Sequence, residues 1–320
     1  MPAFELPDAT AIDAAARRIA PHAARTPVLR SRSLDALAGA GLHFKCENLQ
    51  RAGAFKFRGA CNAVWSLDEA QAARGVVTHS SGNHGAALAL AARTRGIPAH
   101  VVVPEGAVRV KIAAIEAFGA TLHRCAPTMA AREEAAAQVR ERTGATLVHP
   151  FTDPRVIAGQ GTCALELLDQ AGPLDALVAP IGGGGLVGGS AIAAHARDPR
   201  IAIHAAEPAG AADAQASLQR GERVTDLTAD TVCDGLRGTI GPINFALLQQ
   251  HAVEVLTIED VDTVAAMRLV WERLKMVIEP SSAIALAAIL VHRERFAGLR
   301  VGVILSGGNV DLDRCFRDGP

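Results

Sequence analysis

The chain has 320 residues, of which 49% are hydrophobic and 20% charged, and its formal net charge is −1. Its balanced charge, without runs of lysine or arginine, excludes binding to nucleic acid and to anionic membrane surfaces, and it has no apolar run of the length of a membrane span. Six scattered cysteines without a C-x-x-C pair indicate reduced thiols, and the acidic start does not look like a signal peptide, so we expect a cytoplasmic protein.

Short apolar strands alternate with amphipathic helices along most of the chain, which is typical of parallel β-α units. Two prolines, Pro150 and Pro154, interrupt the pattern, and a self-contained block at about 70–145 has four strands and its own helices. These features predict two domains: a large one from residues 1–68 and 148–320 and a small mobile one from residues 69–147. We expect ligands beyond the carboxyl ends of the strands. The strands that can be located are 42–47, 75–79, 99–103, 121–124, 176–181, 201–206, 253–258 and 300–305, and the expected helices are 8–24, 60–67, 84–95, 107–118, 128–142, 155–170, 187–197, 211–219, 260–275 and 281–292.

A lysine, Lys56, stands between two phenylalanines just before the predicted helix 60–67. Apolar neighbours and a helix N-terminus both disfavour the ammonium form, so the pKa of Lys56 should be lowered. A lysine that is partly neutral can attack a carbonyl group and form a Schiff base. The ordinary alternative is a surface lysine whose alkyl chain packs over the two aromatic rings.

The first of three loops at strand ends connects the strand 75–79 to the helix 84–95, and its sequence is His79-Ser80-Ser81-Gly82-Asn83-His84-Gly85. Small hydroxyl and amide side chains beside the N–H groups of a helix N-terminus are typical of a carboxylate or phosphate site. An ordinary helix cap would explain part of this pattern, but two serines, an asparagine and a histidine exceed what capping needs.

The second loop carries four consecutive glycines, Gly182 to Gly185, after the strand 176–181. The backbone N–H groups of such a loop can surround an anion from several sides. The loop also fits the G-x-G-x-x-G pattern of dinucleotide sites, with Glu207 near the place of the ribose-binding acid. By itself it therefore leaves both a nicotinamide dinucleotide and a smaller phosphate ester open.

The third loop follows the strand 300–305 and reads Ser306-Gly307-Gly308-Asn309. Together with the two loops above, the segment around Lys56 and the sequence Glu279-Pro280-Ser281-Ser282, it resembles the fold-type II pyridoxal-phosphate enzymes of the threonine/serine dehydratase and serine racemase group, from about residue 26 to 313. The resemblance implies an α/β fold similar to the β subunit of tryptophan synthase, with two open, twisted, mostly parallel sheets flanked by helices. It leaves little support for a dinucleotide, which would give Lys56, Asn83 and Ser306 no role.

The resemblance also implies roles for single residues. Lys56 is similar to the lysine that carries pyridoxal phosphate, and Ser81 to a second catalytic residue, the serine facing the opposite side of the substrate in racemases. The implied cofactor-binding residues are Phe55, Lys56, Asn83, Gly182, Gly183, Gly184, Gly185, Leu186, Glu279 and Ser306. The implied substrate-binding residues are Ser80, Ser81, Gly82, Asn83, His84 and Arg132.

The reaction implied by this resemblance is the elimination of water from a β-hydroxy amino acid, which gives a 2-oxo acid and ammonia. Neutral Lys56 would remove the α-proton, and a serine rather than an acid at the ring nitrogen, Ser306, would favour β-elimination over transamination. A serine or aspartate racemase with a dehydratase side activity is the alternative, because Ser81 could supply a proton on the face opposite Lys56. A homodimer is the expected assembly, and the short C-terminal end predicts no regulatory domain of the kind found in biosynthetic threonine dehydratases.

The segment from Ala206 to Asp213 resembles the part of this group that binds a divalent cation. Glu207 and Asp213 would supply carboxylates and Ala211 a backbone oxygen, and such hard oxygen ligands suit Mg²⁺ or Ca²⁺. The alternative is an acid at a strand end followed by an acid that caps a helix.

The choice of substrate depends most on Arg132, near the start of the helix 128–142. In racemase-like relatives an arginine at this point can face a second carboxylate of the ligand, and a guanidinium binds a carboxylate through paired hydrogen bonds. Arg132 thus favours 3-hydroxyaspartate, although its spacing with neighbouring alanines also fits a helix surface. Phe151 and Gly238 would add apolar or open space, which would instead admit threonine or a bulkier substrate such as phenylserine, in addition to serine.

Overall fold

The computed structural model describes residues 5–106 and 109–312, without the side chains of residues 109–111. Its larger sheet has six strands in the order β1-β2-β10-β7-β8-β9, and all neighbours are parallel except β1 and β2. Both chain ends contribute to this sheet. Its strands are β1 (Val28–Leu29), β2 (Gly41–Cys46), β7 (Ala176–Pro180), β8 (Ala202–Pro208), β9 (Glu254–Ile258) and β10 (Arg300–Leu305).

The smaller sheet has four parallel strands in the order β5-β4-β3-β6, all from the middle of the chain. The fourth strand, β6, is the one that sequence patterning could not locate, because two residues are too few to show an alternation. The strands are β3 (Val76–His79), β4 (Ala99–Pro104), β5 (Thr121–Cys125) and β6 (Thr146–Leu147).

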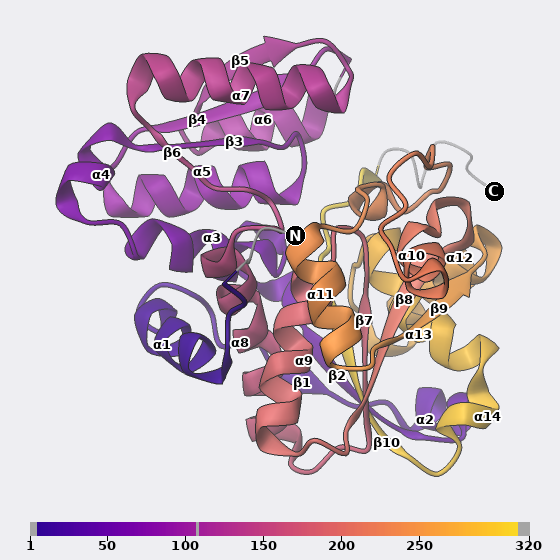
Figure 1. The fold of residues 1–320 in the computed structure, drawn as a ribbon. Helices are drawn as coiled ribbons and strands as arrows, with labels where there is room; N and C mark the ends of the chain where they lie inside the picture. The colour runs from indigo at the N-terminus through magenta and orange to yellow at the C-terminus, as the bar shows by residue number, and fades with distance from the viewer. Residues whose placement is uncertain (1–4, 107–108, 313–320) are drawn as a thin grey trace.

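Helices cover both sheets (Figure 1). Because the central strands are buried on both faces, they are continuous apolar runs, as in β7, where all five residues are buried. Helices α1, α8, α9 and α11 pack on one face of the large sheet and α2, α12, α13 and α14 on the other. The helices are α1 (Ala9–Ile19), α2 (Arg32–Ala38), α3 (Lys56–Trp65), α4 (Glu69–Arg74), α5 (Asn83–Arg95), α6 (Arg109–Ala117), α7 (Met129–Thr143), α8 (Pro154–Ala171), α9 (Gly185–Arg197), α10 (Asp213–Arg220), α11 (Pro242–Gln250), α12 (Asp260–Leu274), α13 (Pro280–Val291) and α14 (Arg293–Phe296), with short 3₁₀ turns η1 (Glu47–Leu49), η2 (Arg51–Gly53), η3 (Ala209–Ala211) and η4 (Asp234–Leu236).

Helix α3 lies between the two sheets (Figure 1), where its apolar side chains share a buried cluster with those of α5. It also packs closely against α8: a Cβ added to Gly159 of α8 would come within 2.6 Å of the Cα of Gly59. Only glycine permits such an approach of two helix backbones. The predicted start of this helix, at residue 60, was wrong, because the helix begins at Lys56 itself.

Several other expectations need correction. The first helix ends at Ile19 rather than near residue 24, since Pro21 cannot continue the helix hydrogen bonds. Helix α9 begins at Gly185, earlier than expected, and strand β1 and helices α2, α4, α11 and α14 were not predicted. The fold class itself is confirmed: two mostly parallel sheets flanked by helices. Over the ranges that the structure describes, no helix is long and apolar enough to cross a membrane.

Candidate active site

One cavity of about 460 Å³ lies at the carboxyl ends of strands from both sheets. Segments that follow β3, β4, β7 and β10 all contribute to its wall, as expected for a ligand site in an open parallel sheet. Every residue that we predicted to be catalytic, cofactor-binding or substrate-binding lines this cavity. The structure therefore brings together side chains that are far apart in the sequence, such as Lys56 and Ser306, which are 250 positions apart.

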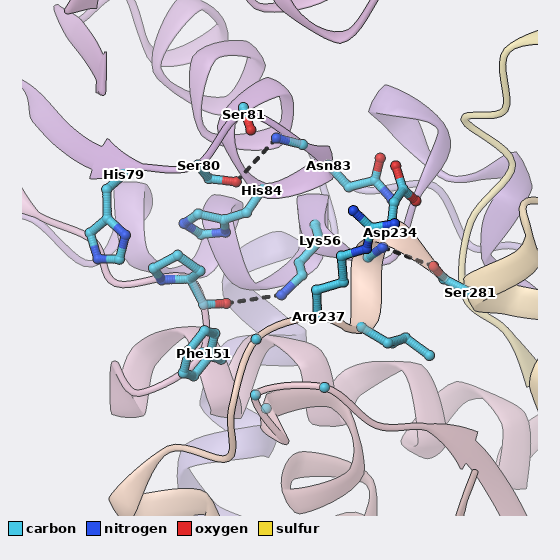
Figure 2. A pocket seen from close by; sticks show the side chains of 18 of the residues that line it. Lys56, His79, Ser80, Ser81, Asn83, His84, Phe151, Asp234, Arg237 and Ser281 are labelled. Atoms are coloured by element: carbon cyan, nitrogen blue, oxygen red, sulfur yellow. Dashed lines mark hydrogen bonds between the residues drawn. The ribbon is translucent and has the colours of Figure 1, made fainter. Parts of the chain in front are cut away.

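Lys56 projects into the cavity from the first turn of α3 (Figure 2). Its amine donates a hydrogen bond of 3.0 Å to the backbone oxygen of Pro150 and lies 5.0 Å from the centre of the Phe55 ring. Burial of the amine lowers its pKa to about 8, because the charged form loses hydration that the wall does not replace. The predicted direction of this shift is confirmed, and the amine is partly neutral near neutral pH.

A buried ion-pair network holds the helix that carries Lys56. The Arg58 guanidinium, 0% exposed, donates to both carboxylate oxygens of Glu47 at 2.7 and 2.8 Å. It also donates to both oxygens of Glu166 on α8, which in turn pairs with the buried Lys45 at 2.7 Å. Because the two cations balance the two carboxylates, none of these buried charges is left without a counter-charge. The first turn of α3 is thereby tied to α8 and to the end of β2.

The four-glycine loop forms a second wall. Gly184 has φ +88°, and α9 starts directly after it, so the first N–H groups of this helix have no partner within the helix. The loop lies against Phe151, since a Cβ on Gly183 would come 2.3 Å from that ring. Free N–H groups at a helix N-terminus beside a cavity form a site for a phosphate.

The loop from Ser80 to His84 forms the opposite wall, at the N-terminus of α5 (Figure 2). Ser80 Oγ accepts a hydrogen bond of 3.4 Å from the N–H of Gly82. The buried His84 ring lies 3.3 Å from the backbone oxygen of Val148, and its Nδ1 has no hydrogen-bond partner among the described residues. Burial, with Lys56 nearby, keeps the pKa of His84 well below its ordinary value. His84 is therefore a neutral ring, and the helix N-terminus and serine hydroxyls are the better groups for a carboxylate.

A chain of side-chain hydrogen bonds connects α5 to the large sheet across the cavity. Asn83 donates to Glu279 at 2.7 Å and accepts from Asn309 at 3.0 Å, and within the described ranges its second amide N–H group is left for a ligand. Ser306 is buried after β10, and its Oγ lies 3.4 Å from the backbone oxygen of Ser281. Both Glu279 and Ser306 line the cavity.

Arg132 extends from α7 to the wall of the same cavity. Its Nε is buried and has no hydrogen-bond partner among the described residues. An arginine on an exposed helix surface would have this nitrogen in contact with water, whereas here the nitrogen is buried at the cavity wall. The guanidinium is a cation beside the cavity, and its Nε–H meets no acceptor in the part of the chain that the structure describes.

Comparison with known proteins decides the family. Residues 19–307 match the family model described as "Pyridoxal-phosphate dependent enzyme". The chain belongs to this family. It is 50% identical over 301 residues to a beta-hydroxyaspartate dehydratase of Paracoccus denitrificans, covering 94% of this chain and 96% of the relative. It is 49% identical over 310 residues to a serine racemase of Arabidopsis thaliana, covering 95% and 94%. The solved structure of maize serine racemase has a TM-score of 0.95 and 43% identity, covering 98% of this chain and 97% of that one.

The predicted cofactor, pyridoxal phosphate, is thus confirmed, and the residues present fit it. The cavity offers a partly neutral lysine, a helix N-terminus without side chains in its path and an unused amide N–H on Asn83. The dinucleotide alternative is wrong. Glu207, which it required beside the ribose, does not line the cavity and instead accepts hydrogen bonds from two N–H groups of α10.

The predicted cation ligands of this fold-type II enzyme lie apart from the cavity, around the start of α10. Glu207 accepts from the N–H groups of Ala214 and Gln215 at 2.7 and 2.9 Å, and Asp213 accepts from Ile240 at 2.6 Å. Burial, with a smaller contribution from the Asp213 charge, raises the pKa of Glu207 to about 8, and burial raises that of Asp213 to about 6. The Asp213 charge thus disfavours a second charge on Glu207, and no cluster of three acidic, histidine or cysteine side chains occurs within the described parts.

Sequence reasoning missed several residues around the cavity. The structure adds Glu105 and Met129 to its lining, together with His79, Asp234 and Arg237, which Figure 2 labels. Arg237 belongs to the stretch between α10 and α11, where no periodic pattern marks any position as special. The backbone oxygen of Pro150 could not be identified either, because any residue type offers a carbonyl. His79 stands at the carboxyl end of a predicted strand, where ligand-site residues are expected. This position was the one signal in the sequence that could have identified it as a cavity residue.

Proposed function

We propose that this enzyme is a dehydratase of β-hydroxy amino acids whose preferred substrate is 3-hydroxyaspartate, which it converts to a 2-oxo acid and ammonia. The observation that carries the proposal is the buried Nε of Arg132, which has no hydrogen-bond partner in the described ranges and lies at a cavity that also contains Lys56. A substrate with one carboxylate needs only one anion site on this side of the cavity. A second site in the form of a guanidinium suits a dicarboxylic amino acid.

The roles of the protein groups follow from their positions. When bound, pyridoxal phosphate supplies an electron sink for the charge left at the substrate Cα. The neutral amine of Lys56 removes the Cα proton, and the resulting ammonium donates to the Pro150 oxygen, already 3.0 Å away. The N-terminus of α5, with the hydroxyls of Ser80 and Ser81, holds the α-carboxylate. Arg132 then holds the β-carboxylate and orients the hydroxyl that leaves.

Closure of the cavity would exclude water from this reaction. We propose that residues 69–147 form a small lobe that moves toward the remainder, residues 1–68 and 148–320, when substrate binds. The cavity supports this proposal, because Ser81 and Arg132 come from one part and Lys56 and Ser306 from the other. A substrate held by both parts would stabilise the closed arrangement.

The proposal is tested by comparing kcat/KM for serine, threonine, phenylserine and the stereoisomers of 3-hydroxyaspartate, with release of 2-oxo acid and of ammonia measured separately. We expect one 3-hydroxyaspartate isomer to exceed serine by about tenfold or more, since one charged hydrogen bond contributes about 1.5–3 kcal/mol. Equal or lower values for all hydroxyaspartate isomers would contradict the proposed substrate. If none of the tested amino acids gives a 2-oxo acid, the proposed reaction is contradicted.

A second candidate function, serine or aspartate racemase, is favoured by Ser81, which lines the cavity. The relative from Arabidopsis thaliana carries this name. A hydroxyl on the face opposite Lys56 could return a proton to Cα with inverted configuration. Chiral analysis of L-serine and L-aspartate incubations separates the two activities, because predominant D-amino acid indicates the racemase and 2-oxo acid without D-amino acid the dehydratase.

We also propose that Glu207, Asp213 and the backbone oxygen of Ala211 hold Mg²⁺ or Ca²⁺. We expect Mg²⁺ to raise the Tm of the EDTA-treated protein by a few degrees, because a ligand that binds only the folded state stabilises it. Asp213→Asn should abolish this shift, since the amide still accepts from the Ile240 N–H but carries no charge. Asp226→Asn, at an exposed acid in the stretch that follows α10, should keep the shift. An unchanged Tm after exhaustive EDTA treatment and Mg²⁺ addition would exclude the site.

A further inference from the structure

Asn244, in the first turn of α11, is a buried amide directly behind the glycine loop. Its Nδ2 donates one hydrogen bond to the backbone oxygen of Phe151, at 2.8 Å, and another to that of Gly183. Both N–H groups of the amide are therefore used on backbone carbonyls from two other segments. The Oδ1 atom is buried without a hydrogen-bond partner in the described part of the chain, and Asn244 does not line the cavity.

The bond to Gly183 sets the direction of the next N–H group. In a trans peptide, the carbonyl of one residue and the N–H of the following residue point in opposite directions. The Gly183 oxygen is held toward α11 by Asn244 and also by the N–H of Gly241, at 3.2 Å. The N–H of Gly184, which lines the cavity, is consequently directed away from α11. It adds a donor to those at the N-terminus of α9, which starts at Gly185.

Asn244 also fills the space behind the loop. A Cβ on Gly184 would come 2.7 Å from the Cβ of Asn244, and one on Gly183 would come 2.3 Å from the Phe151 ring. The loop is thus packed between these two side chains. A shorter side chain at position 244 would remove both the packing and the hydrogen bond that keep the Gly183 peptide in this orientation.

The second bond connects the loop to the partner of Lys56. Phe151, whose oxygen accepts from Asn244, directly follows Pro150, whose oxygen accepts from the Lys56 amine. One buried amide thereby fixes two walls of the cavity relative to each other. Buried polar groups that are held this way have well-defined positions, because an alternative arrangement would leave the carbonyl oxygens without donors.

We infer that Asn244 is a positioning residue for the phosphate group of the cofactor. It acts through the Gly183 peptide, which it holds so that backbone N–H groups of the loop face the phosphate. The inference rests on the proposed placement of the phosphate at Gly182 to Leu186. Loss of Asn244 should therefore weaken binding of the phosphate, and leave binding of the ring and aldehyde largely unchanged.

The test uses the full-length apoenzyme titrated with pyridoxal 5′-phosphate and, separately, with pyridoxal, which lacks the phosphate. The Kd of pyridoxal divided by the Kd of pyridoxal 5′-phosphate isolates the contribution of the phosphate to binding. The two variants are Asn244→Leu, whose side chain has a volume similar to that of asparagine, and Asn244→Asp, whose side chain has the same shape. Neither side chain can donate hydrogen bonds to both carbonyl groups. We expect either variant to reduce the ratio by about tenfold or more, equivalent to about 1.4 kcal/mol, with the Kd of pyridoxal changed by less than about threefold.

Asn62→Leu serves as the matched control. Asn62 is also a buried amide that donates to a backbone oxygen, that of Arg155 at 2.7 Å, but it lies outside this cavity. Its loss should lower Tm without changing the Kd ratio. A wild-type ratio in both Asn244 variants would overturn the inference, even if both bind the two compounds more weakly. A wild-type enzyme that binds both compounds equally would instead overturn the placement of the phosphate itself.

Discussion

Replacing Lys56 with alanine is expected to lower kcat for dehydration by about 10⁴-fold or more while the fold is retained. The amine of Lys56 lines the cavity, and its lowered pKa of about 8 reflects an environment that disfavours charge. In the proposed mechanism, removing it eliminates both the covalent attachment of the cofactor and the base for the Cα proton. The fold should tolerate the change, because Lys56 is in a helix, alanine favours helix, and the amine makes one hydrogen bond to a backbone oxygen.

The measurement combines steady-state kinetics with borohydride reduction and peptide mass spectrometry. Reduction should attach the cofactor to the peptide that contains Lys56 in the wild-type enzyme and in Lys275→Asn, a control at an exposed lysine with φ +59°, which asparagine tolerates. In Lys56→Ala no peptide should carry it, and the circular dichroism spectrum should be unchanged. Turnover within a hundredfold of the wild type, or cofactor fixed on another lysine, would contradict the role of Lys56.

Replacing Arg132 with alanine is expected to lower kcat/KM for 3-hydroxyaspartate by about 10- to 100-fold, and that for serine by less than about threefold. The reason is that the guanidinium would bind only the second carboxylate, which serine lacks. Arg132→Lys keeps the charge but not the paired donor geometry, so its kcat/KM for 3-hydroxyaspartate should lie between those of the wild type and Arg132→Ala. Binding of the cofactor, measured as its Kd for the apoenzyme, should not change.

Arg140→Ala is the matched control, because Arg140 is an exposed arginine on the same helix, α7, away from the cavity. Arg140→Ala should leave kcat/KM unchanged for serine, threonine, phenylserine and 3-hydroxyaspartate. Equal losses on serine, threonine, phenylserine and 3-hydroxyaspartate in Arg132→Ala would show that Arg132 supports the cavity wall and does not select the substrate. The preference for a dicarboxylic substrate would then have to be abandoned.

Much of the fold could be predicted because buried parallel strands are short apolar runs with turn residues after them. The strands that could be located agree with the structure to within one or two residues. The elements that were missed lacked this signal. Helix α11, Pro-Ile-Asn-Phe-Ala-Leu-Leu-Gln-Gln, is apolar around most of its circumference, so it has little helical periodicity, and β6 has only two residues.

The sequence by itself determined the cofactor class, since that chemistry is carried by consecutive residues. A lysine between two phenylalanines, four glycines after a strand and a Ser-Ser-Gly-Asn-His loop keep their local chemistry wherever the chain places them. Their order along the chain sufficed to connect them to one family.

Only the tertiary structure decided which way single side chains face and which distant groups they meet. The orientation of Arg132 depends on the rotation of α7 about its axis, which packing sets. Arg58 meets Glu166 from 108 positions away, and Asn244 meets Phe151 from 93 positions away. No local pattern encodes such contacts, because they arise when separately formed helices and strands pack together and bury the same polar groups.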